Sequence, residues 1–450
     1  MQLVPYSHSN GIDGLPHTAV AADQIEVLMS TAQYKERLLQ LIEGAKKRIY
    51  IAALYLQDDE AGRHVLRQLY LAKQRNPELD VQVLVDFHRA QRGLIGKGPQ
   101  VGNDAFYRKM AEEFSPIAIG IHGVPVKNRE WAGVLHLKGF VFDDTVFYSG
   151  ASINDVYLGW QGRYRYDRYH LITDAALADA MVHFLRQDLM GSDAVVSLLH
   201  QPVPTAKVLR RSIKRLKMRL SRARYQIPAA NQSGEVNVIP LLGLGRQGNQ
   251  LNRTIVQLLR TAQRKVFICT PYFNLPSQLT SVIGKLLKRG VKVQIVVGDK
   301  TANDFYLPPD QPFSPVGALP YLYEQNLKRF AKRHQKAIAA GLLDLRLWWH
   351  DDNSYHLKGI QVDDHAYLLT GNNLNPRAWA LDLENGLLLL DHSGKLKHKF
   401  TQEQEAILAH TQTLSGHQAI ESTEQYPAPA ARLLKRLKRV RADLLLKRVL

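Results

Sequence analysis

The sequence predicts an α/β fold of two pseudo-symmetric α/β sandwich halves with one site at their interface. The stretch VLHLKGFVFDDTVFYSGASIND (134–155) returns as SYHLKGIQVDDHAYLLTGNNLN (354–375), with the same His, Lys and Asp spacing. LLQLIEGAKKRIYIAALYL from Leu38 aligns without gaps with IVQLLRTAQRKVFICTPYF from Ile255. At 450 residues the chain is also long enough for two domains or two halves sharing one centre.

Within each half, the patterns predict a helix, a buried strand, a second helix and a second apolar strand. A longer segment then leads to the strand that carries HLKG. After that strand the chain turns back, and the next element is RYDRYHLITD (165–174) in the first half and DLENGLLLLD (382–391) in the second. We expect five segments: an N-terminal arm (1–25), loosely docked; a first half (26–205); a basic linker helix (206–230); a second half (231–415); and a basic C-terminal helix (425–450).

A net charge of +18 favours a polyanionic partner, either nucleic acid or an acidic membrane surface. The linker helix and the C-terminal helix both combine basic residues with leucines at helical spacing. Such a helix either packs its apolar face on the core or contacts anionic lipid, and the leucine-rich faces favour lipid over nucleic acid. The membrane-contact candidates are Arg210, Arg211, Lys214, Arg215, Lys435, Arg436 and Arg439.

The compartment is predicted from what the chain lacks. No run of about 18 apolar residues is present, and the N-terminus MQLVPYSHSNGIDG does not have the layout of a signal peptide. A single cysteine, Cys269, excludes an internal disulfide. We therefore expect a cytoplasmic protein.

Each repeated motif places a histidine two residues before a lysine: His136 with Lys138, and His356 with Lys358. Side chains alternate along a strand, so each pair should lie on one face. Two imidazoles and two ammonium groups suit attack on a phosphodiester. One imidazole attacks phosphorus, the other moves protons, and the lysines stabilise nonbridging oxygens. This chemistry requires no metal and no cofactor.

A hairpin turn at Asp143-Asp144 or Asp363-Asp364 should return the chain so that 150–154 and 371–375 pass beside the histidines. We expect Asp143 and Asp363 to support the turn or the domain, because several residues separate them from the histidines. The substrate-binding candidates in the returning segments are Ser152, Asn154, Asn373 and Asn375.

Asp167 and Glu384 occupy matching positions in the third repeated element. A carboxylate bonded to one imidazole nitrogen fixes the tautomer and raises the basicity of the other nitrogen. We therefore expect both carboxylates to serve the histidines in catalysis.

HLKGFVFDD and HLKGIQVDD, followed by GASIN and GNNLN, resemble the paired HKD motifs of the phospholipase D superfamily. The resemblance implies two halves about a pseudo-two-fold axis, with one histidine forming a phosphohistidine and the other serving as general acid and base. It makes His136 and His356 that pair, with phosphate held by Lys138, Lys358, Asn154 and Asn375. Glu384 matches the acidic partner of the later motif, whereas Asp167 departs from the common Glu.

Within the superfamily, ALYLQDD, DFHRAQRG, YSGASINDVY, CTPYFNLP, VGDKTANDFY and TGNNLNPRAW resemble the proteobacterial CDP-diacylglycerol–serine O-phosphatidyltransferases. This resemblance implies phosphatidyl transfer from CDP-diacylglycerol to L-serine and peripheral association with the inner face of the cell membrane. The expected mechanism has His136 as nucleophile and His356, held by Glu384, as proton carrier. Near-identical motifs leave the reverse assignment open, and the oligomeric state is not indicated.

Three alternatives remain at this point. The same site would serve a cardiolipin synthase or a phospholipase D with a different acceptor. The net charge would also suit a phospholipase D-like nuclease. A catalytically silent lipid-binding scaffold is disfavoured by the two intact His and Lys pairs.

Overall fold

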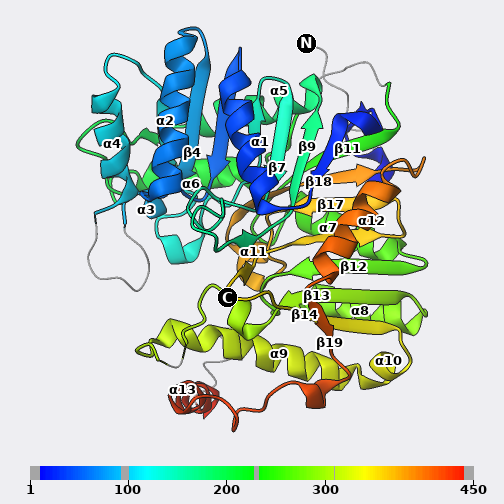
Figure 1. Cartoon of the computed structure of the whole chain (residues 1–450). Helices are drawn as coiled ribbons and strands as arrows, with labels where there is room; N and C mark the ends of the chain where they lie inside the picture. Colours follow the sequence, from blue (N-terminus) through cyan, green and yellow to red (C-terminus); the bar gives the residue numbers. More distant parts are fainter. Residues whose placement is uncertain (1–10, 93–100, 228–232, 309, 440–450) are drawn as a thin grey trace.

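In a computed structural model, which describes residues 11–92, 101–227, 233–308 and 310–439, two large mixed sheets lie side by side (Figure 1). The first sheet has the order β10 (Val196–Ser197), β5 (Gly120–Val124), β4 (Asp80–Asp86), β3 (Arg48–Ala53), β6 (Phe140–Phe142), β7 (Thr145–Ser149), β9 (Tyr169–Thr173) and β2 (Ile25–Leu28). The second has the order β1 (Thr18–Val20), β11 (Val236–Leu244), β18 (Leu383–Leu390), β17 (Ala366–Thr370), β16 (Gly359–Val362), β12 (Lys265–Thr270), β13 (Lys292–Gly298), β14 (Leu343–Trp348) and β19 (Thr411–Thr413).

The two sheets repeat one plan. In each, three parallel strands (β3, β4 and β5, or β12, β13 and β14) are followed on one side by an antiparallel hairpin and two further strands. Strand β1 is the addition that makes the second sheet longer. It belongs to the segment expected to be a loosely docked arm, yet it is hydrogen-bonded to β11 as an edge strand. The predicted α/β class and its internal repeat are confirmed.

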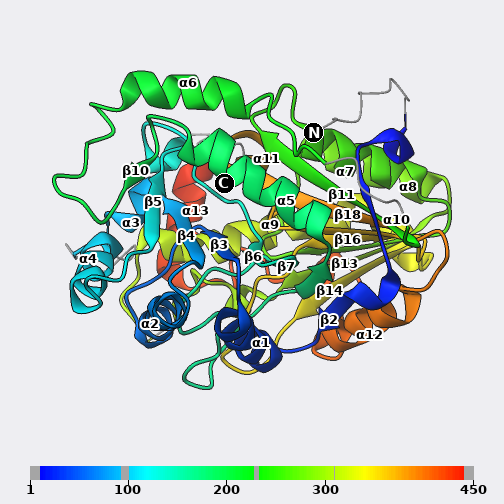
Figure 2. The ribbon, with the colours of Figure 1, turned by 90° about the horizontal axis from the view of Figure 1, so that it is seen from above.

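Helices cover both sheets. They are α1 (Thr31–Gly44), α2 (Glu60–Arg75), α3 (Phe87–Ala90), α4 (Asn103–Glu113), α5 (Ala175–His183), α6 (Arg210–Leu220), α7 (Gln250–Thr261), α8 (Ser277–Lys288), α9 (Leu319–Arg333), α10 (Gln335–Ala339), α11 (Pro376–Ala380), α12 (Lys397–Leu408) and α13 (Ala428–Arg439). Figure 2 shows α1 and α2 on one side of the molecule and α5, α6, α7 and α8 on the other.

One apolar core is common to the two halves. It joins Tyr50 and Tyr148 of the first sheet to Leu387 and Leu389 of the second, together with side chains of α5 and α6. Burial of aliphatic and aromatic side chains is the main stabilising contribution to a domain. A core drawn from both sheets therefore fixes the halves against each other.

The apolar faces of the two basic helices pack on protein, which is one of the two alternatives that the sequence left open. The leucine-rich face of α6 (Leu209, Ile213, Leu216 and Leu220) is buried in the common core, and the exposed side carries the basic residues and Met218. Ala430 and Leu434 of α13 pack with Tyr321 and Tyr426. The leucine-rich face of α6 is consequently no argument for lipid, because protein already covers it. Residues 440–450 of the C-terminal helix lie outside the described residues.

The aspartates of the repeated motifs tie each hairpin turn to the neighbouring strand. Asp143 accepts hydrogen bonds from the backbone N–H groups of Lys46, Lys47 and Arg48, at 2.7 to 3.0 Å. Asp363 accepts from the backbone N–H groups of Gln263, Arg264 and Lys265, at 2.6 to 2.8 Å. Both have a φ of 50°, a left-handed conformation that Asp and Asn tolerate.

Asp363→Asn should lower the free energy of unfolding by about 1–3 kcal/mol, because a neutral amide offers only one acceptor oxygen to three N–H groups. We expect the turnover rate to change little, since the aspartate lies outside the site described below. Asp351→Asn is the matched control: Asp351 also has a positive φ, of 49°, but its side chain is 73% exposed. Urea unfolding of both variants tests this, and equal stabilities would contradict it.

Candidate active site

The two halves exchange backbone hydrogen bonds where their motifs meet. β8 (Arg165–Tyr166) pairs in parallel with β15 (Ser354–Tyr355), and Leu135 forms an isolated bridge with Leu383. Accordingly, the N–H of His136 donates to the carbonyl oxygen of Leu383, and that of His356 donates to the carbonyl oxygen of Tyr166, both at 2.9 Å. Each motif histidine is held by the backbone of the opposite half.

This exchange corrects one detail of the strand expectation. Strands β6 and β16 begin only at Phe140 and Gly359, so the histidines and lysines lie in the extended segments that precede them. These segments leave their own sheet to pair with the other half. The side chains still alternate: Leu137 enters the common core, while His136 and Lys138 face the site.

His136 is paired with Glu384 of the opposite half. Its Nδ1 lies 2.9 and 3.0 Å from the two carboxylate oxygens, and both side chains are buried. Burial, reinforced by Lys138 and Lys358, lowers the pKa of His136 well below its ordinary value. Burial also raises the pKa of Glu384. The lowered pKa favours the uncharged imidazole, and its Nε2 has no hydrogen-bond partner among the described residues.

His356 has a more crowded environment. Its Nδ1 lies 2.8 Å from the Oδ2 of Asp167 and also contacts the Lys358 ammonium, which is itself 3.0 Å from that oxygen. The hydroxyl of Tyr157 lies 3.0 Å from Nδ1 and 3.3 Å from Nε2. Burial and then Lys358 lower the pKa of His356 to about 4. Burial raises the pKa of Asp167, but Lys358 and His356 outweigh it and lower that pKa to about 2.

The expectation that Glu384 holds His356 is therefore wrong. Glu384 holds His136, and Asp167 holds His356, so each carboxylate serves the histidine of the other half. The physical reason is the exchange of backbone bonds, which brings each carboxylate-bearing segment beside the opposite motif. Sequence alignment of the repeats gave matching positions but could not give this crossed pairing.

Both motif lysines are buried, each at 1% exposure, which is rare for an ammonium group without a function or a partner. Burial and the charge of Lys358 lower the pKa of Lys138 to about 7. The Nζ of Lys138 lies 3.3 Å from the hydroxyl of Ser152. A Cβ on Gly150 would lie 2.8 Å from the Nζ of Lys358, so this glycine leaves room for the ammonium.

The four substrate-binding candidates lie in different surroundings. Ser152 is buried against Lys138, which supports its predicted place beside the motif. Asn375 caps α11 by accepting from the N–H of Ala378, and Asn154 accepts from the N–H of Tyr157. The Oδ1 of Asn373 is buried with no hydrogen-bond partner among the described residues. Ser152 and Asn373 thus retain polar groups for a ligand, whereas Asn154 and Asn375 also order the loop backbone.

Four further side chains lie at the site: Asn385, Arg165, Asp304 and Tyr157. Asn385 accepts from the N–H of Lys138 and donates to its carbonyl oxygen, both at 2.8 Å. Arg165 and Asp304 form an ion pair at 2.9 Å, and the Arg165 guanidinium lies 4.8 Å from the ring centre of Tyr157. Only their place beside matching motif residues could have suggested Asn385 and Arg165.

Comparisons with known proteins agree with this geometry. A family described as "Cardiolipin synthase, PLD-like domain" matches residues 38–189 and 255–408. A CDP-diacylglycerol–serine O-phosphatidyltransferase of Haemophilus influenzae is 48% identical over 98% of this chain and 97% of that protein, and one of Escherichia coli is 45% identical over 98% of each. The crystal structure of phosphatidylserine synthase from Haemophilus influenzae has a TM-score of 0.93 and covers 97% of each chain.

A more distant relative has another acceptor. The CDP-diacylglycerol–glycerol-3-phosphate 3-phosphatidyltransferase of Schizosaccharomyces pombe is 26% identical over 94% of this chain and 96% of that protein. The identities and coverage above place this chain with the serine enzymes. The chain belongs to the CDP-diacylglycerol–serine O-phosphatidyltransferase family, built on two phospholipase D-like halves.

Proposed function

We propose that this chain transfers the phosphatidyl group of CDP-diacylglycerol to L-serine in two steps, releasing CMP and forming phosphatidylserine. The observation that carries the proposal is the pair of buried imidazoles, each held by a carboxylate of the opposite half, with two buried lysines beside them. Family membership supports the substrates, because the serine enzymes named above match nearly the whole chain.

In the first step, the Nε2 of His136 attacks the phosphorus that bears diacylglycerol. A P–N bond forms, the P–O bond to CMP breaks, and CMP leaves as a phosphate monoester. The assignment is supported by the uncharged imidazole and its unoccupied Nε2, with Glu384 holding Nδ1. Lys138 and Lys358 stabilise the charge that develops on the nonbridging oxygens.

In the second step, the serine hydroxyl attacks the phosphatidyl-enzyme. The new P–O bond forms as the P–N bond breaks, and His356 accepts the hydroxyl proton. The ionised Asp167 beside Nδ1 stabilises the imidazolium that results. Removing a proton from serine needs more assistance than expelling CMP, so His356 should matter mainly in this step.

A labelling experiment separates the two histidines. With CDP-diacylglycerol carrying ³²P in the diacylglycerol-bearing phosphate and no serine, His356→Ala should release one equivalent of CMP and retain label on the protein. His136→Ala should do neither. Steady-state turnover of both should fall by roughly 10²–10⁴-fold, the usual range for loss of an acid or base. The retained label should be acid-labile and alkali-stable, as a phosphohistidine is.

Two results would overturn this assignment. Label on His136→Ala, but not on His356→Ala, would reverse the two roles. A wild-type enzyme that never carries label, even when rapidly quenched, would indicate direct transfer to serine. Circular dichroism of both variants provides the folding control.

The ion pair of Arg165 and Asp304 provides a place for the acceptor. Serine carries an ammonium and a carboxylate, and this pair offers one group of each opposite sign. Both side chains are partly accessible, at 17% and 14% exposure. Tyr157 links them to the proton carrier, because Arg165 lies over its ring and its hydroxyl contacts His356. We propose that Arg165 binds the serine carboxylate and Asp304 the ammonium.

Acceptor analogues test this assignment by charge. Arg165→Gln should raise the KM for L-serine by about 10- to 100-fold, the loss of one charged hydrogen bond, and leave ethanolamine, which lacks a carboxylate, unaffected. Asp304→Asn should impair serine and ethanolamine alike but leave 3-hydroxypropionate unaffected. Labelling without serine should stay at the wild-type level in both. The control variants are Arg346→Gln and Asp344→Asn, an ion pair on β14. Equal losses for all three acceptors would contradict the assignment.

Membrane binding by a basic surface completes the proposal. Among the described residues, no helix combines the length and apolar character needed to cross a bilayer. Arg210, Arg211, Lys214 and Arg215 are exposed on α6, and Lys435, Arg436 and Arg439 are exposed on α13. We propose that these side chains bind anionic headgroups at the inner face of the cell membrane, where the lipid substrate resides.

Charge removal on α6 measures that contribution. The variant Arg210→Gln, Arg211→Gln, Lys214→Gln should bind anionic vesicles roughly 100-fold more weakly at physiological salt, since each cation near such a surface contributes about 1 kcal/mol. The control with the same net charge is Arg75→Gln, Lys332→Gln, Arg333→Gln, three exposed cations elsewhere. Vesicle co-sedimentation provides the measurement. Equal losses of vesicle binding in the two triple variants would show that net charge alone determines binding. Stronger binding of the wild-type protein to duplex DNA than to vesicles would favour the nuclease alternative.

A further inference from the structure

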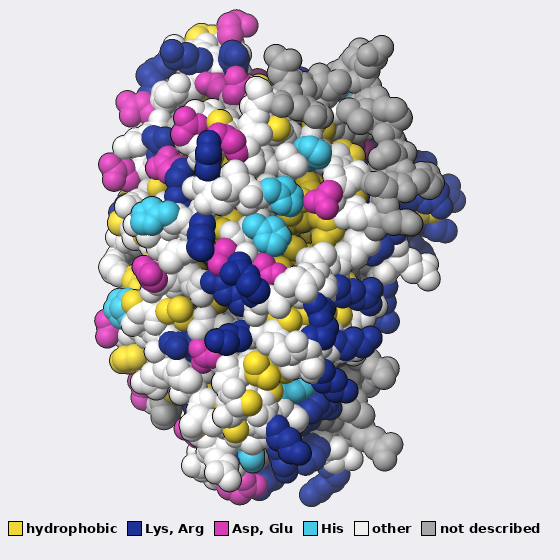
Figure 3. Space-filling view, turned by 90° about the vertical axis from the view of Figure 1, so that its right-hand side faces the viewer, with side chains coloured by type: hydrophobic (Ala, Val, Ile, Leu, Met, Phe, Trp, Pro, Cys, Tyr) yellow, Lys and Arg dark blue, Asp and Glu magenta, His cyan; other side chains and the backbone are white. Residues whose placement is uncertain are grey.

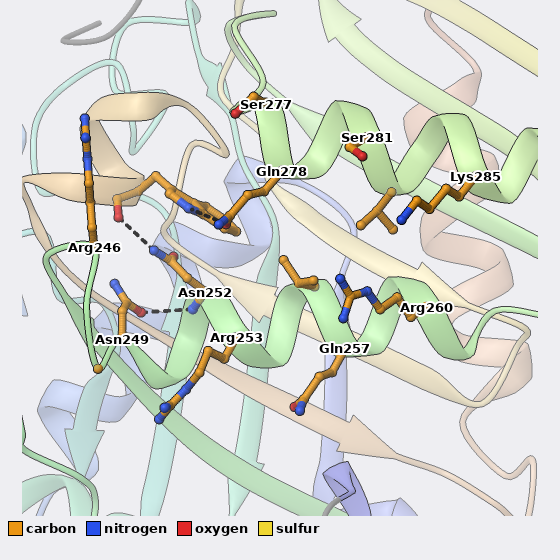
Figure 4. Close-up of a pocket in the computed structure, with 14 residues that line it drawn as sticks. Arg246, Asn249, Asn252, Arg253, Gln257, Arg260, Ser277, Gln278, Ser281 and Lys285 are labelled. Carbon is orange, nitrogen blue, oxygen red and sulfur yellow. Dashed lines mark hydrogen bonds between the residues drawn. The ribbon is translucent and has the colours of Figure 1, made fainter.

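A basic groove of about 570 Å³ runs between α7 and α8 (Figure 4), and neither motif histidine lines it. Figure 4 shows Arg260 of α7 and Lys285 of α8 at one end and Arg246 with Asn249 at the other. Arg253 is the fourth cation of the lining, although its side chain extends from α7 away from Arg260 and Lys285, and none of the lining residues is acidic. The electrostatic character of the groove therefore selects an anion.

The cations of this groove have no acidic partner among the described residues. Within the described parts of the chain, Arg246, Arg253, Arg260 and Lys285 form no ion pair, although many other arginines of this protein do. Lys and Arg side chains gather along the right-hand edge of Figure 3, which is the rear of Figure 1, where α7 and α8 lie (Figure 2). Four unpaired cations in one concave surface form an electrostatic footprint for phosphate.

Polar groups of the groove supply a second indication of a ligand. Asn252 is 5% exposed, and its Oδ1 has no hydrogen-bond partner among the described residues. Its Nδ2 donates to the carbonyl oxygen of Trp379 at 2.7 Å. A buried acceptor without a donor is costly, so a ligand hydroxyl or ordered water is needed there. Ser277 and Ser281 add hydroxyl groups along α8.

The groove is connected to the active-site loop. Trp379 lines it, and the indole N–H donates to Gln278 of α8 at 3.3 Å. Trp379 belongs to α11, a helix capped by Asn375, the last residue of the second motif loop. A ligand that contacts Trp379 therefore lies one short helix away from a phosphate-binding candidate.

We propose that this groove is a second phosphate-binding site, which takes the phosphate of a small hydroxyl-bearing ligand. The phosphate lies between Arg260 and Lys285, whose side chains point toward each other in Figure 4, and a ligand hydroxyl donates to Asn252. Two sources offer this chemistry: the headgroup of a phospholipid, or a free phosphate ester in solution. The site is separate from the proposed reaction centre, so it can be tested whatever acceptor the enzyme uses.

Tryptophan fluorescence tests the site directly. The full chain is titrated with sn-glycerol 3-phosphate and, separately, with dihexanoylphosphatidylglycerol below its micelle concentration. We expect a fluorescence change that Trp379→Phe removes. The variant Arg260→Gln, Lys285→Gln should raise the Kd at least 10-fold. The control Lys288→Gln, Arg333→Gln removes the same charge outside the groove and should leave the Kd unchanged. All four substituted side chains are exposed, and thermal melting verifies folding.

The two probes identify the source, and other results reject the site. Tighter binding of the lipid assigns the groove to a headgroup, and tighter binding of the ester assigns it to a soluble metabolite. The proposal is overturned if neither probe binds wild-type protein, if the groove and control variants bind equally well, or if the fluorescence change persists without Trp379. Because serine and CDP-diacylglycerol are absent, failure here leaves the transfer mechanism standing.

Discussion

The hydrogen bonds that cross between the halves are the constraint on which this site depends. Glu384 is hydrogen-bonded to the imidazole of His136 in the first motif, and Asp167 is hydrogen-bonded to that of His356 in the second. Neither half alone therefore contains a histidine with its carboxylate. The common apolar core, which includes Tyr148 and Leu387, keeps the halves in the position that these bonds require. Precise placement of catalytic groups is thus a property of the whole chain.

Burial of charge is the second feature of the site. Lys138, Lys358, Asp167 and Glu384 are all almost inaccessible, and removing such groups from water costs several kcal/mol each. The cost is partly offset by their mutual contacts, and the substrate phosphate in the proposed mechanism would add a counter-charge for the two lysines. Fixed charges in a water-poor site need no reorganisation during reaction, which is the source of their effect on a transition state.

The sequence predicted the repeat, the two histidine–lysine pairs and the turn-supporting aspartates, because these depend on local spacing. The crossed pairing could not be predicted, since matching positions in an alignment do not tell which half a carboxylate faces. The burial of the α6 leucines could not be predicted either, because a helix that lies on lipid and a helix that packs on protein have the same basic amphipathic pattern. Asn385 was missed because its role, holding the backbone of Lys138, requires the other half.

The two almost identical motifs have different neighbours, and this difference supports the separate roles proposed for their histidines. The residue after Glu384 is Asn385, which orders the backbone of Lys138, whereas the residue after Asp167 is Arg168, which pairs with Glu403. His136 has a carboxylate alone at Nδ1, whereas the carboxylate at His356 also contacts Lys358, and the Tyr157 hydroxyl contacts the His356 imidazole. A nucleophile needs a free lone pair and a proton carrier needs a partner that stabilises its charged form. Substitutions around duplicated motifs can therefore divide one symmetric site into two functions.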